Sequence, residues 1–553
     1  MPRVEARWLT QVDVSFGTIW EAVAQRIPEE VAICEPGRDC TYAEFDESSA
    51  RLAAALDAAG VGPGDKVACY LYNGVAYLQT VFAAFKIGAV PVNANYRYTE
   101  GELTALLADA DAAALVFSGE LTGNVTHAVR NLPGLRLLVR VGAIPAGHTA
   151  VPDAPELADL LAQASPRPAQ PRPGSDELFM YTGGTTGKPK GVIWRQGDLL
   201  GSLGPRVYQS LGASGLPDTL AEAVALAADG RAQGRSPVAM PVVPLMHATG
   251  LFNSMGVLVA GGRVVTAGHG SLDARRVWET VAAQRVETLF VAGNAVCQPL
   301  VNELLAAEQA GRPHDLRSLT SILSSGTAMS DRIKQALHER ARVTITDAIA
   351  SSEGGPFAFA ITESVADLPA RFFPAAAARV FTQDGEQVAP GSGQAGMLAF
   401  SGPIPTGYYK DAGKTTATFR VIDGVRYTIP GDLAEVESDG AIRFLGRGSG
   451  VINTGGEKVH PAEVEDVLLA HPDVTDAAVV GVPDETWGER VVAVVATANT
   501  ELTSAELQDT VRRGLAGYKV PRAVVLLPGL PRTPTGKLEV ARVKAIAQEA
   551  LKQ

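Results

Sequence analysis

Cysteine is scarce in this chain of 553 residues, long apolar runs are missing, and there is no excess of positive charge. The cysteines at positions 34, 40, 69 and 297 are scattered without metal-ligand spacing, so we expect reduced, buried thiols rather than a disulfide framework or a zinc site. No apolar run approaches the roughly 20 residues that span a bilayer. The first residues lack the charged-then-apolar layout of a signal peptide. We therefore expect no integral membrane association and a cytoplasmic location.

Charge and length limit the partners and the number of domains. The formal net charge of −12 disfavours nucleic acid as a partner, because a polyanion would be repelled. With 46% hydrophobic and 20% charged residues, the composition is typical of a soluble globular protein. At 553 residues the chain is too long for one ordinary domain. We expect one large domain and at least one smaller one.

The first half of the chain alternates between helix and strand patterns. Thr41 and Glu44 have the spacing of a capping box, and the apolar stripe that follows predicts a helix ending before Gly60. Short apolar runs at 67–71 and 115–117 predict buried strands, and a helix is predicted at 76–87. This rhythm indicates an α/β fold with a parallel sheet. Similar alternation continues past residue 300.

Two later segments bear on domain organisation. Helices predicted at 461–470 and 504–515, with strands at 477–482, 491–496 and 523–527, form an α+β unit of domain size. Three glycines within 446–450 suit a hinge, so we place the domains at 1–446 and 447–553. The segment 201–236, helical at 218–228, is interpreted as an inserted excursion. It could border a pocket or be a surface elaboration, and both readings stay open.

The most informative run is residues 181–191, Tyr-Thr-Gly-Gly-Thr-Thr-Gly-Lys-Pro-Lys-Gly. Glycines let backbone N–H groups converge on an anion, while threonine hydroxyls and a lysine add donors and charge. A flexible linker would explain the glycines but not the paired threonines or Lys-Pro-Lys. A Walker loop is excluded, because only three residues separate the first glycine from Gly-Lys and proline follows. The run predicts a phosphate-binding loop made of Gly183, Gly184, Thr185, Thr186, Gly187 and Lys190.

From Thr182 to Gly191 the loop resembles the signature of adenylate-forming enzymes, the ANL superfamily of acyl-CoA synthetases, peptide-synthetase adenylation domains and firefly luciferase. Further motifs of that family follow in order: Pro244-Leu245-Met246-His247, Ser351-Ser352-Glu353, Tyr427-Thr428-Ile429-Pro430-Gly431-Asp432, Gly446-Arg447, Gly455-Gly456-Glu457-Lys458-Val459 and Pro534-Thr535-Gly536-Lys537. The resemblance covers nearly the whole chain. It implies a large N-terminal AMP-binding domain of several subdomains with parallel-rich sheets, and a small, mobile α+β C-terminal domain.

The resemblance implies an acyl-CoA synthetase, in which a carboxylic acid and ATP give acyl-AMP and pyrophosphate before the acyl group passes to coenzyme A. Such a site must hold two anions together and stabilise charge on the phosphoryl oxygens. By resemblance, Lys537 bridges the carboxylate and the α-phosphate, and Thr186 belongs to the catalytic set. Glu353 would hold Mg²⁺, which prefers carboxylate oxygens. His247 is expected to gate the acyl pocket and contact the carboxylate, not to act as a general base.

Nucleotide contacts follow from the same resemblance. Asp432 would accept hydrogen bonds from both ribose hydroxyls, and Arg447 would contact the same sugar. Ile349 stands where the family often has an aromatic residue that stacks on adenine, and Ser449 stands where it commonly has Asp or Lys. The full set of expected nucleotide contacts is Thr182, Gly183, Gly184, Thr185, Thr186, Gly187, Lys190, Ser325, Gly326, Asp347, Ile349, Ser352, Asp432, Arg447 and Lys537.

The acyl group and the acceptor are less defined. The runs at 180–184, 192–195 and 407–411 look most like actinobacterial ligases for fatty acids and steroid side chains. Expected pocket walls are His247, Gly250, Asn253, Ala292, Gly293 and Asn294. The partners implied are a small carboxylic acid, ATP and coenzyme A; a homodimer is left open. Two alternatives remain: an adenylation enzyme that loads a separate carrier protein, and an inactive nucleotide-binding homologue.

Overall fold

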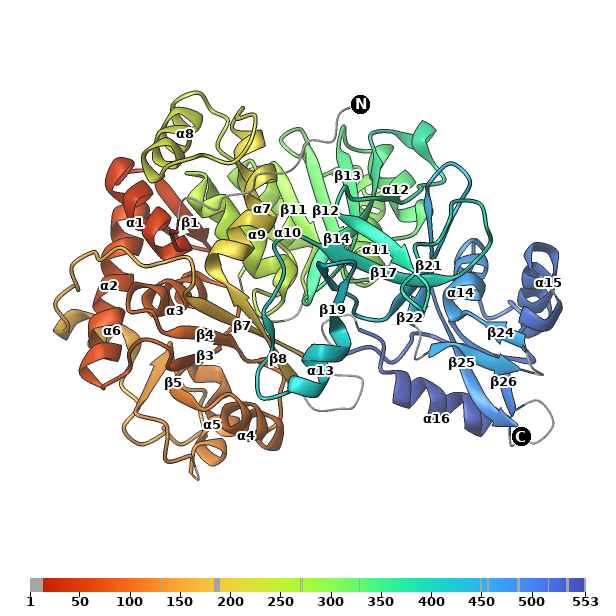
Figure 1. The fold of residues 1–553 in the computed structure, drawn as a ribbon, viewed down its shortest axis with the longest axis horizontal. Helices are drawn as coiled ribbons and strands as arrows, with labels where there is room; N and C mark the ends of the chain where they lie inside the picture. The colour runs from red at the N-terminus through yellow and green to blue at the C-terminus, as the bar shows by residue number, and fades with distance from the viewer. Residues whose placement is uncertain are drawn as a thin grey trace.

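The computed structural model describes residues 13–551 apart from 131, 184–188, 269, 271, 328, 448–449, 455–456, 485–487, 516 and 534–536. Within these residues the chain forms four β-sheets flanked by helices. Figure 1 shows the first helices at one end of the molecule and the last helices and strands at the opposite end. The α/β class predicted from the sequence is confirmed.

The seven-stranded sheet is built by residues 66–195, with one short strand added from residues 407–408. Its strands, in spatial order, are β18 (Gly407–Tyr408), β8 (Pro189–Arg195), β7 (Glu177–Gly183), β4 (Val90–Asn93), β3 (Lys66–Tyr70), β5 (Ala112–Ser118) and β6 (Leu137–Val141). From β7 to β6 the pairing is parallel. Strands β3 and β5 are buried almost throughout, as expected for a sheet covered on both faces.

Six helices belong to the same region: α1 (Phe16–Arg26), α2 (Tyr42–Ala58), α3 (Val75–Lys86), α4 (Glu100–Asp109), α5 (Thr122–Ala128) and α6 (Leu157–Gln163). The capping box at the start of α2 is confirmed, because the Thr41 hydroxyl accepts from the Glu44 N–H and the Glu44 carboxylate accepts from the Thr41 N–H. The predicted helix at 76–87 and the strands at 67–71 and 115–117 correspond to α3, β3 and β5.

The nine-stranded sheet forms the centre of the molecule. Its order is β15 (Phe373–Pro374), β14 (Gly354–Thr362), β13 (Thr344–Ser351), β12 (Ser321–Ser325), β11 (Thr288–Val291), β9 (Val238–Pro241), β10 (Arg263–Val265), β1 (Val31–Glu35) and β2 (Arg38–Thr41). The strands from β13 to β1 run parallel. Its connecting helices are α9 (Ala248–Val259), α10 (Ala274–Gln284), α11 (Gly293–Gln309) and α12 (Asp331–His338).

Between β8 and β9 in the sequence lie α7 (Gln196–Ser210) and α8 (Leu220–Ala232). The helix predicted at 218–228 corresponds to α8, whereas α7 was not predicted. A six-stranded antiparallel sheet follows the nine-stranded one, with a short helix, α13 (Ala412–Thr418). Its strands are β16 (Ala378–Phe381), β17 (Gly396–Ser401), β19 (Phe419–Ile422), β20 (Val425–Thr428), β21 (Asp432–Val436) and β22 (Ile442–Arg447).

The C-terminal unit has a five-stranded sheet with a hydrophobic cluster on each face, and both clusters are drawn entirely from residues after 450. Its strands are β23 (Ile452–Thr454), β24 (Glu457–Val459), β25 (Asp476–Asp484), β26 (Gly488–Ala496) and β27 (Ala523–Leu527), and its helices are α14 (Pro461–Leu469), α15 (Ser504–Gly514) and α16 (Val540–Ala550). All five predicted elements of this unit are confirmed. The boundary at 446/447 stays a prediction.

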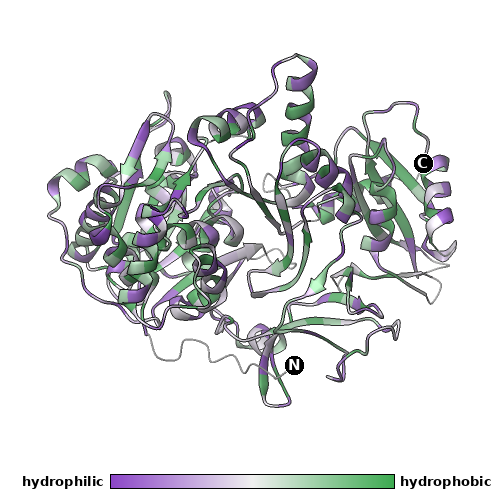
Figure 2. Ribbon diagram, turned by 90° about the horizontal axis from the view of Figure 1, so that it is seen from above, coloured by the Kyte–Doolittle hydropathy of each residue, from purple (hydrophilic) through white to green (hydrophobic). Residues whose placement is uncertain are grey.

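Hydropathy follows the layers. In Figure 2 the strands are largely hydrophobic, while the surrounding helices also carry hydrophilic residues. The largest core cluster joins the seven-stranded sheet, the nine-stranded sheet and the antiparallel sheet into one packed body. Among the described helices, none combines the length and apolar character needed to cross a membrane.

Candidate active site

A large cavity, about 2280 Å³ in volume, is lined by residues of all four sheet regions. Typical small-molecule pockets measure roughly 300–1,000 Å³, so this cavity can hold more than one ligand at a time. It lies at the carboxyl ends of the parallel strands β11, β12 and β13, where open α/β sheets bind ligands.

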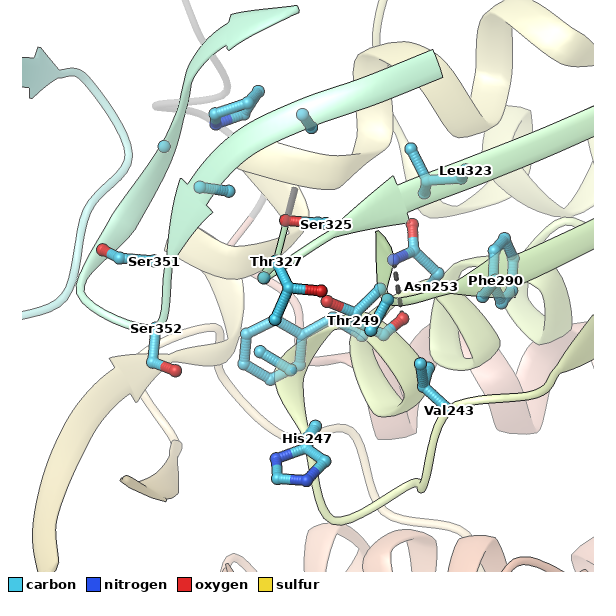
Figure 3. A pocket seen from close by; sticks show the side chains of 18 of the residues that line it. Val243, His247, Thr249, Asn253, Phe290, Leu323, Ser325, Thr327, Ser351 and Ser352 are labelled. Carbon is cyan, nitrogen blue, oxygen red and sulfur yellow. Dashed lines mark hydrogen bonds between the residues drawn. The ribbon is translucent and has the colours of Figure 1, made fainter. Parts of the chain in front are cut away.

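The wall of the cavity changes character from one side to the other. Figure 3 shows hydroxyl side chains, Ser351 and Ser352 among them, near the turn between β13 and β14. On the other side, Val243, Phe290 and Leu323 form an apolar wall. A ligand with a polar head and an apolar body fits this polarity.

Glu353 occupies the turn between β13 and β14, and its side chain is held from a distant strand. The carboxylate is buried, and its Oε1 accepts a hydrogen bond of 2.7 Å from the hydroxyl of Tyr408 on β18. The indole of Trp194 on β8 donates to the Ser352 carbonyl at 2.9 Å. Gly354 continues the turn at φ +136°, and a Cβ there would lie 2.7 Å from Thr428 Cγ2, so only glycine fits. The structure thus fixes a carboxylate at the cavity wall.

Glu353 fits the chemistry of a magnesium site shared with a ligand. The described residues hold no group of three or more His, Cys, Asp or Glu side chains that could hold a metal ion without help. Mg²⁺ usually takes one or two carboxylates together with phosphate oxygens and water. A lone buried carboxylate beside a cavity that admits a nucleotide is consistent with that arrangement.

His247 caps the start of α9 and lines the cavity. Burial, followed by the charges of Lys537 and Arg97, lowers the pKa of its imidazole to about 3. The ring is therefore neutral near pH 7 and is a weak general base. Within the described structure its buried Nε2 has no hydrogen-bond partner, and neither does the buried hydroxyl of Thr327 nearby. Orphaned polar atoms at a cavity wall are available to a ligand.

The loop between β27 and α16 brings Lys537 to the same cavity. Two hydrogen bonds close this loop: the Lys537 N–H donates to Thr533 Oγ1 at 3.1 Å, and the Thr533 N–H donates to the Lys537 carbonyl at 2.6 Å. The charge of Lys537 acts on His247, so the two side chains share one electrostatic environment. Residues from three distant parts of the chain, Glu353, His247 and Lys537, thus meet at one site.

Asp432 begins β21 and is buried opposite Arg447 of β22 in the strand register. Its neighbours Gly431 and Leu433 line the cavity. The pairing places the two proposed ribose contacts side by side on adjacent strands. Binding of a sugar by these residues stays a prediction, since the Arg447 side chain lies outside the described part.

Some of the other predicted nucleotide contacts line the cavity, and others lie outside the residues that the structure describes. Thr182, Ser325, Gly326 and Ser352 line the cavity. Gly183 ends β7, and the loop residues Gly184, Thr185, Thr186 and Gly187, like Ser449, lie outside the described residues. Of the expected acyl walls, His247, Asn253, Ala292 and Asn294 line the cavity, whereas Gly250 and Gly293 do not.

Among the residues that the structure describes, the predicted contacts Lys190, Asp347 and Ile349 do not line the cavity. Lys190 forms an ion pair with Asp411, and Ile349 packs against the main core while Ala348 and Ala350 line the cavity. Asp347 is buried and pairs with Lys334 of α12 at 3.0 Å. Burial raises the pKa of Asp347, and Lys334 opposes that shift. Their contacts with a nucleotide remain predictions.

Sequence reasoning missed several residues that shape the site. Asn93 donates to the carbonyls of Tyr181 and Met246, at 2.9 and 2.7 Å, and thereby ties the phosphate-loop strand to the turn before His247. Asn73 accepts from the Leu245 N–H at 2.7 Å and supports the same turn. Tyr408 was missed as the partner of Glu353. These contacts join residues far apart in sequence, so no local spacing reveals them.

The excursion after the phosphate loop is partly a wall of the cavity. Helix α8 contributes no lining residue among those described, whereas α7 lines the cavity through Leu199, Ser202, Leu203, Pro205, Arg206, Val207, Gln209 and Ser210. Of the two readings left open for this segment, the pocket border therefore applies to α7.

Comparisons with known proteins agree with this geometry. The family described as AMP-binding enzyme matches residues 20–409, and the family described as AMP-binding enzyme C-terminal domain matches residues 463–537. The chain is 40% identical to a 3-oxocholest-4-en-26-oate–CoA ligase of Rhodococcus rhodochrous, over 95% of this chain and 94% of that protein.

Two further similarities span nearly the whole chain. A medium/long-chain-fatty-acid–CoA and 3-oxocholest-4-en-26-oate–CoA ligase of Mycolicibacterium smegmatis is 38% identical over 97% of both proteins. The crystal structure of the anthranilate CoA ligase AuaEII in complex with anthranoyl-AMP superposes with a TM-score of 0.81, covering 98% of each chain at 22% identity. This last similarity concerns the fold.

Proposed function

Because this chain belongs to the family of AMP-binding enzymes, we propose that it is an ATP-dependent, AMP-forming acyl-CoA ligase. In the first half-reaction a carboxylate oxygen attacks the α-phosphorus of ATP, and pyrophosphate leaves. In the second, the sulfur of coenzyme A attacks the acyl carbon, and AMP leaves with the electrons of the broken C–O bond. The observation that carries the proposal is the meeting of Lys537, His247 and Glu353 at one cavity.

Each of these residues has a task that its position supports. Lys537 supplies a compact cation between the attacking carboxylate and the α-phosphate, where negative charge must be brought together. His247, neutral at the wall, can orient the carboxylate by a hydrogen bond without adding charge. Asp432 and Arg447 would hold the ribose, and Thr182 to Lys190 the phosphates. Glu353 would hold Mg²⁺, whose charge offsets that of the phosphates when it is bound.

The apolar wall favours a lipophilic acid. Val243, Phe290 and Leu323 surround the part of the cavity beyond His247. Relatives named for medium- and long-chain fatty acids and for a cholestenoate match nearly the whole chain. We therefore place the substrate among fatty acids and sterol side-chain acids. We also propose a cytoplasmic enzyme with an adenylation domain at 1–446 and a mobile domain at 447–553.

The proposal is tested by acid-dependent exchange of labelled pyrophosphate into ATP, with linear, branched, aromatic and polycyclic acids. We expect exchange with lipophilic acids and, after addition of coenzyme A, a thioester and AMP detected by mass spectrometry. Transfer to a carrier protein but not to coenzyme A would favour the carrier-loading alternative. Absence of exchange with every acid would favour an inactive homologue.

A further inference from the structure

Helix α7 carries a cation into the cavity. Its cavity-lining residues include Ser202, Leu203, Arg206, Val207 and Ser210, which recur with helical spacing, together with Leu199, Pro205 and Gln209 beside them. Arg206 is the arginine among these residues. Its side chain is accessible from the cavity although protein surrounds it, which lowers the pKa of its guanidinium by loss of hydration.

Arg206 lacks a counter-ion in the part of the chain that the structure describes. No hydrogen bond, ion pair or ring contact joins its guanidinium to another described residue. Three of the five carboxylates that line the cavity have partners of their own, Glu353 with Tyr408, Asp273 with Arg276 and Asp476 with Arg532, and none of the five is paired with Arg206. The guanidinium is exposed toward solvent and unpaired among the described residues, so its donors are available to an acceptor group of a bound ligand.

Packing places Arg206 away from the reacting end. The neighbouring Val207 meets α9 at Gly256, where a Cβ would lie only 2.9 Å from Val207 Cγ2. Gly256 follows His247 by nine residues, which is roughly 13 Å along a helix axis at 1.5 Å per residue. The same face of α9, from Thr249 to Val257, lines the cavity over this distance. The cavity is therefore continuous from His247 to the level of Arg206.

The wall between the two ends is mostly apolar. Between His247 and the level of Arg206 the cavity is lined by apolar side chains of both helices: Leu203 and Val207 of α7, and Phe252 and Val257 of α9. An acid whose carboxylate reaches His247 and Lys537 would lay its apolar body against these side chains. Any oxygen at its remote end would then reach the level of the guanidinium.

We propose that Arg206 is a specificity-determining residue that binds an oxygen acceptor, a ketone or a carboxylate, at the end of the acid remote from the reacting carboxyl group. This inference rests on the proposed acyl-CoA ligase function and deepens it by naming the substrate class. The guanidinium presents several donors in a plane, which suits either oxygen group. The preferred substrates are thus lipophilic acids with two polar ends, not plain hydrocarbon acids.

The test compares acids matched in length in the pyrophosphate-exchange assay: dodecanoic acid, 11-oxododecanoic acid and dodecanedioic acid, with the corresponding hexadecanoic set. For each enzyme we take the ratio of kcat/KM for an oxygen-bearing acid to kcat/KM for its plain counterpart. In Arg206→Met we expect this ratio to fall by about 10- to 100-fold, the scale of a hydrogen bond to a charged group. Arg206→Lys should restore part of the ratio.

Arg235→Met is the matched control, since Arg235 lies in the same excursion but does not line the cavity. It should leave the ratio unchanged. A fall for the dicarboxylate alone would show that an anion is bound, and a fall for both acids would show that a neutral ketone also is; either result supports the proposal. An unchanged ratio in Arg206→Met, or an equal loss for plain and oxygen-bearing acids, would overturn it.

The outcomes also separate this inference from the function on which it rests. If plain acids support exchange and the ratio of kcat/KM values is the same with and without the Arg206 side chain, the ligase function stands and the specificity role is rejected. If none of the acids supports pyrophosphate exchange by the unmodified enzyme, both the ligase function and the specificity role are rejected. Thermal unfolding midpoints of the three variants show whether any loss reflects misfolding.

Discussion

At the scale of single residues, the site depends on side chains held by partners far away in the chain. Glu353, His247 and Lys537 were predicted from their motifs, and all three line the cavity. The hydroxyl that positions Glu353 belongs to Tyr408, and the turn before His247 is held by Asn73 and Asn93. Motifs indicate which residues are predicted to meet a ligand, but a hydrogen bond between residues far apart in the chain has no characteristic spacing in the sequence. The supporting residues therefore required the structure.

Replacement of Tyr408 by phenylalanine should weaken the use of magnesium. The variant loses the 2.7 Å hydrogen bond to Glu353 Oε1 and leaves a buried carboxylate less well oriented. A hydrogen bond to a charged group contributes about 1.5–3 kcal/mol, so we expect kcat/KM for ATP to fall by about tenfold or more. Pyrophosphate exchange measured over a range of Mg²⁺ concentrations should show a raised half-saturation point.

The neighbouring tyrosine offers a matched control. Tyr409 also donates to a carboxylate, Asp111 Oδ2, at 2.7 Å, but that pair is exposed and away from the cavity. Tyr409→Phe should leave the magnesium dependence unchanged. Equal effects of the two substitutions would show that Tyr408 acts only through general stability.

At the scale of elements, the sequence predicted the helices that are stabilised by contacts between residues close together in the chain. Helix α2 was predicted because its capping box and apolar stripe are contiguous in the sequence. Helix α7 was missed because it contains three glycines and Pro205, all poor helix formers. It is held instead by packing, with Gly204 against Leu216 and Val207 against Gly256. Tertiary contacts thus override propensity where the helix forms the cavity wall.

Helix α12 is joined to β13 by the buried ion pair of Lys334 and Asp347. In Lys334→Met the carboxylate loses its partner in a dry environment, and the free energy of unfolding should fall by about 3–5 kcal/mol. The double variant Lys334→Met/Asp347→Leu removes the stranded carboxylate and should recover much of the loss. Denaturant unfolding of both variants measures these differences.

The same pair decides what Asp347 does. If the role of Asp347 is only structural, we expect the folded double variant to bind ATP with nearly normal affinity. A large loss of ATP affinity in the folded double variant would instead favour the nucleotide contact that the family resemblance implies for Asp347. Isothermal titration with ATP separates the two outcomes.

At the scale of the whole molecule, the sequence predicted an α/β body and the elements of an α+β C-terminal unit, but not the order of the strands. That order brings β18 beside β8 and β1 beside β10, and it depends on packing between segments more than 200 residues apart. The meeting of the C-terminal unit with the cavity has the same origin. The motifs named Lys537 and Glu353 separately, and only the folded chain shows that they share a site.

Removal of the Lys537 side chain should separate the two half-reactions. In this arrangement the lysine lies at the cavity with His247, where it can bridge two anions during adenylation. Losing one such charged donor costs roughly 10²- to 10³-fold in rate, so Lys537→Ala should lose acid-dependent pyrophosphate exchange by that factor. Thioester formation from supplied acyl-adenylate and coenzyme A should change only a few-fold, because the phosphoryl transfer is already complete.

The control for this substitution is Lys544→Ala, an exposed lysine of α16 that does not line the cavity and should leave both half-reactions intact. Equal loss of both half-reactions in Lys537→Ala would mean that the lysine holds the C-terminal unit in place instead of activating the acid. The distinction matters for the whole molecule: a unit that only covers the cavity needs a stable interface, whereas a unit that delivers a cation needs Lys537 itself. Selective loss of adenylation would therefore assign the chemistry of the first step to the meeting of the two parts of the chain.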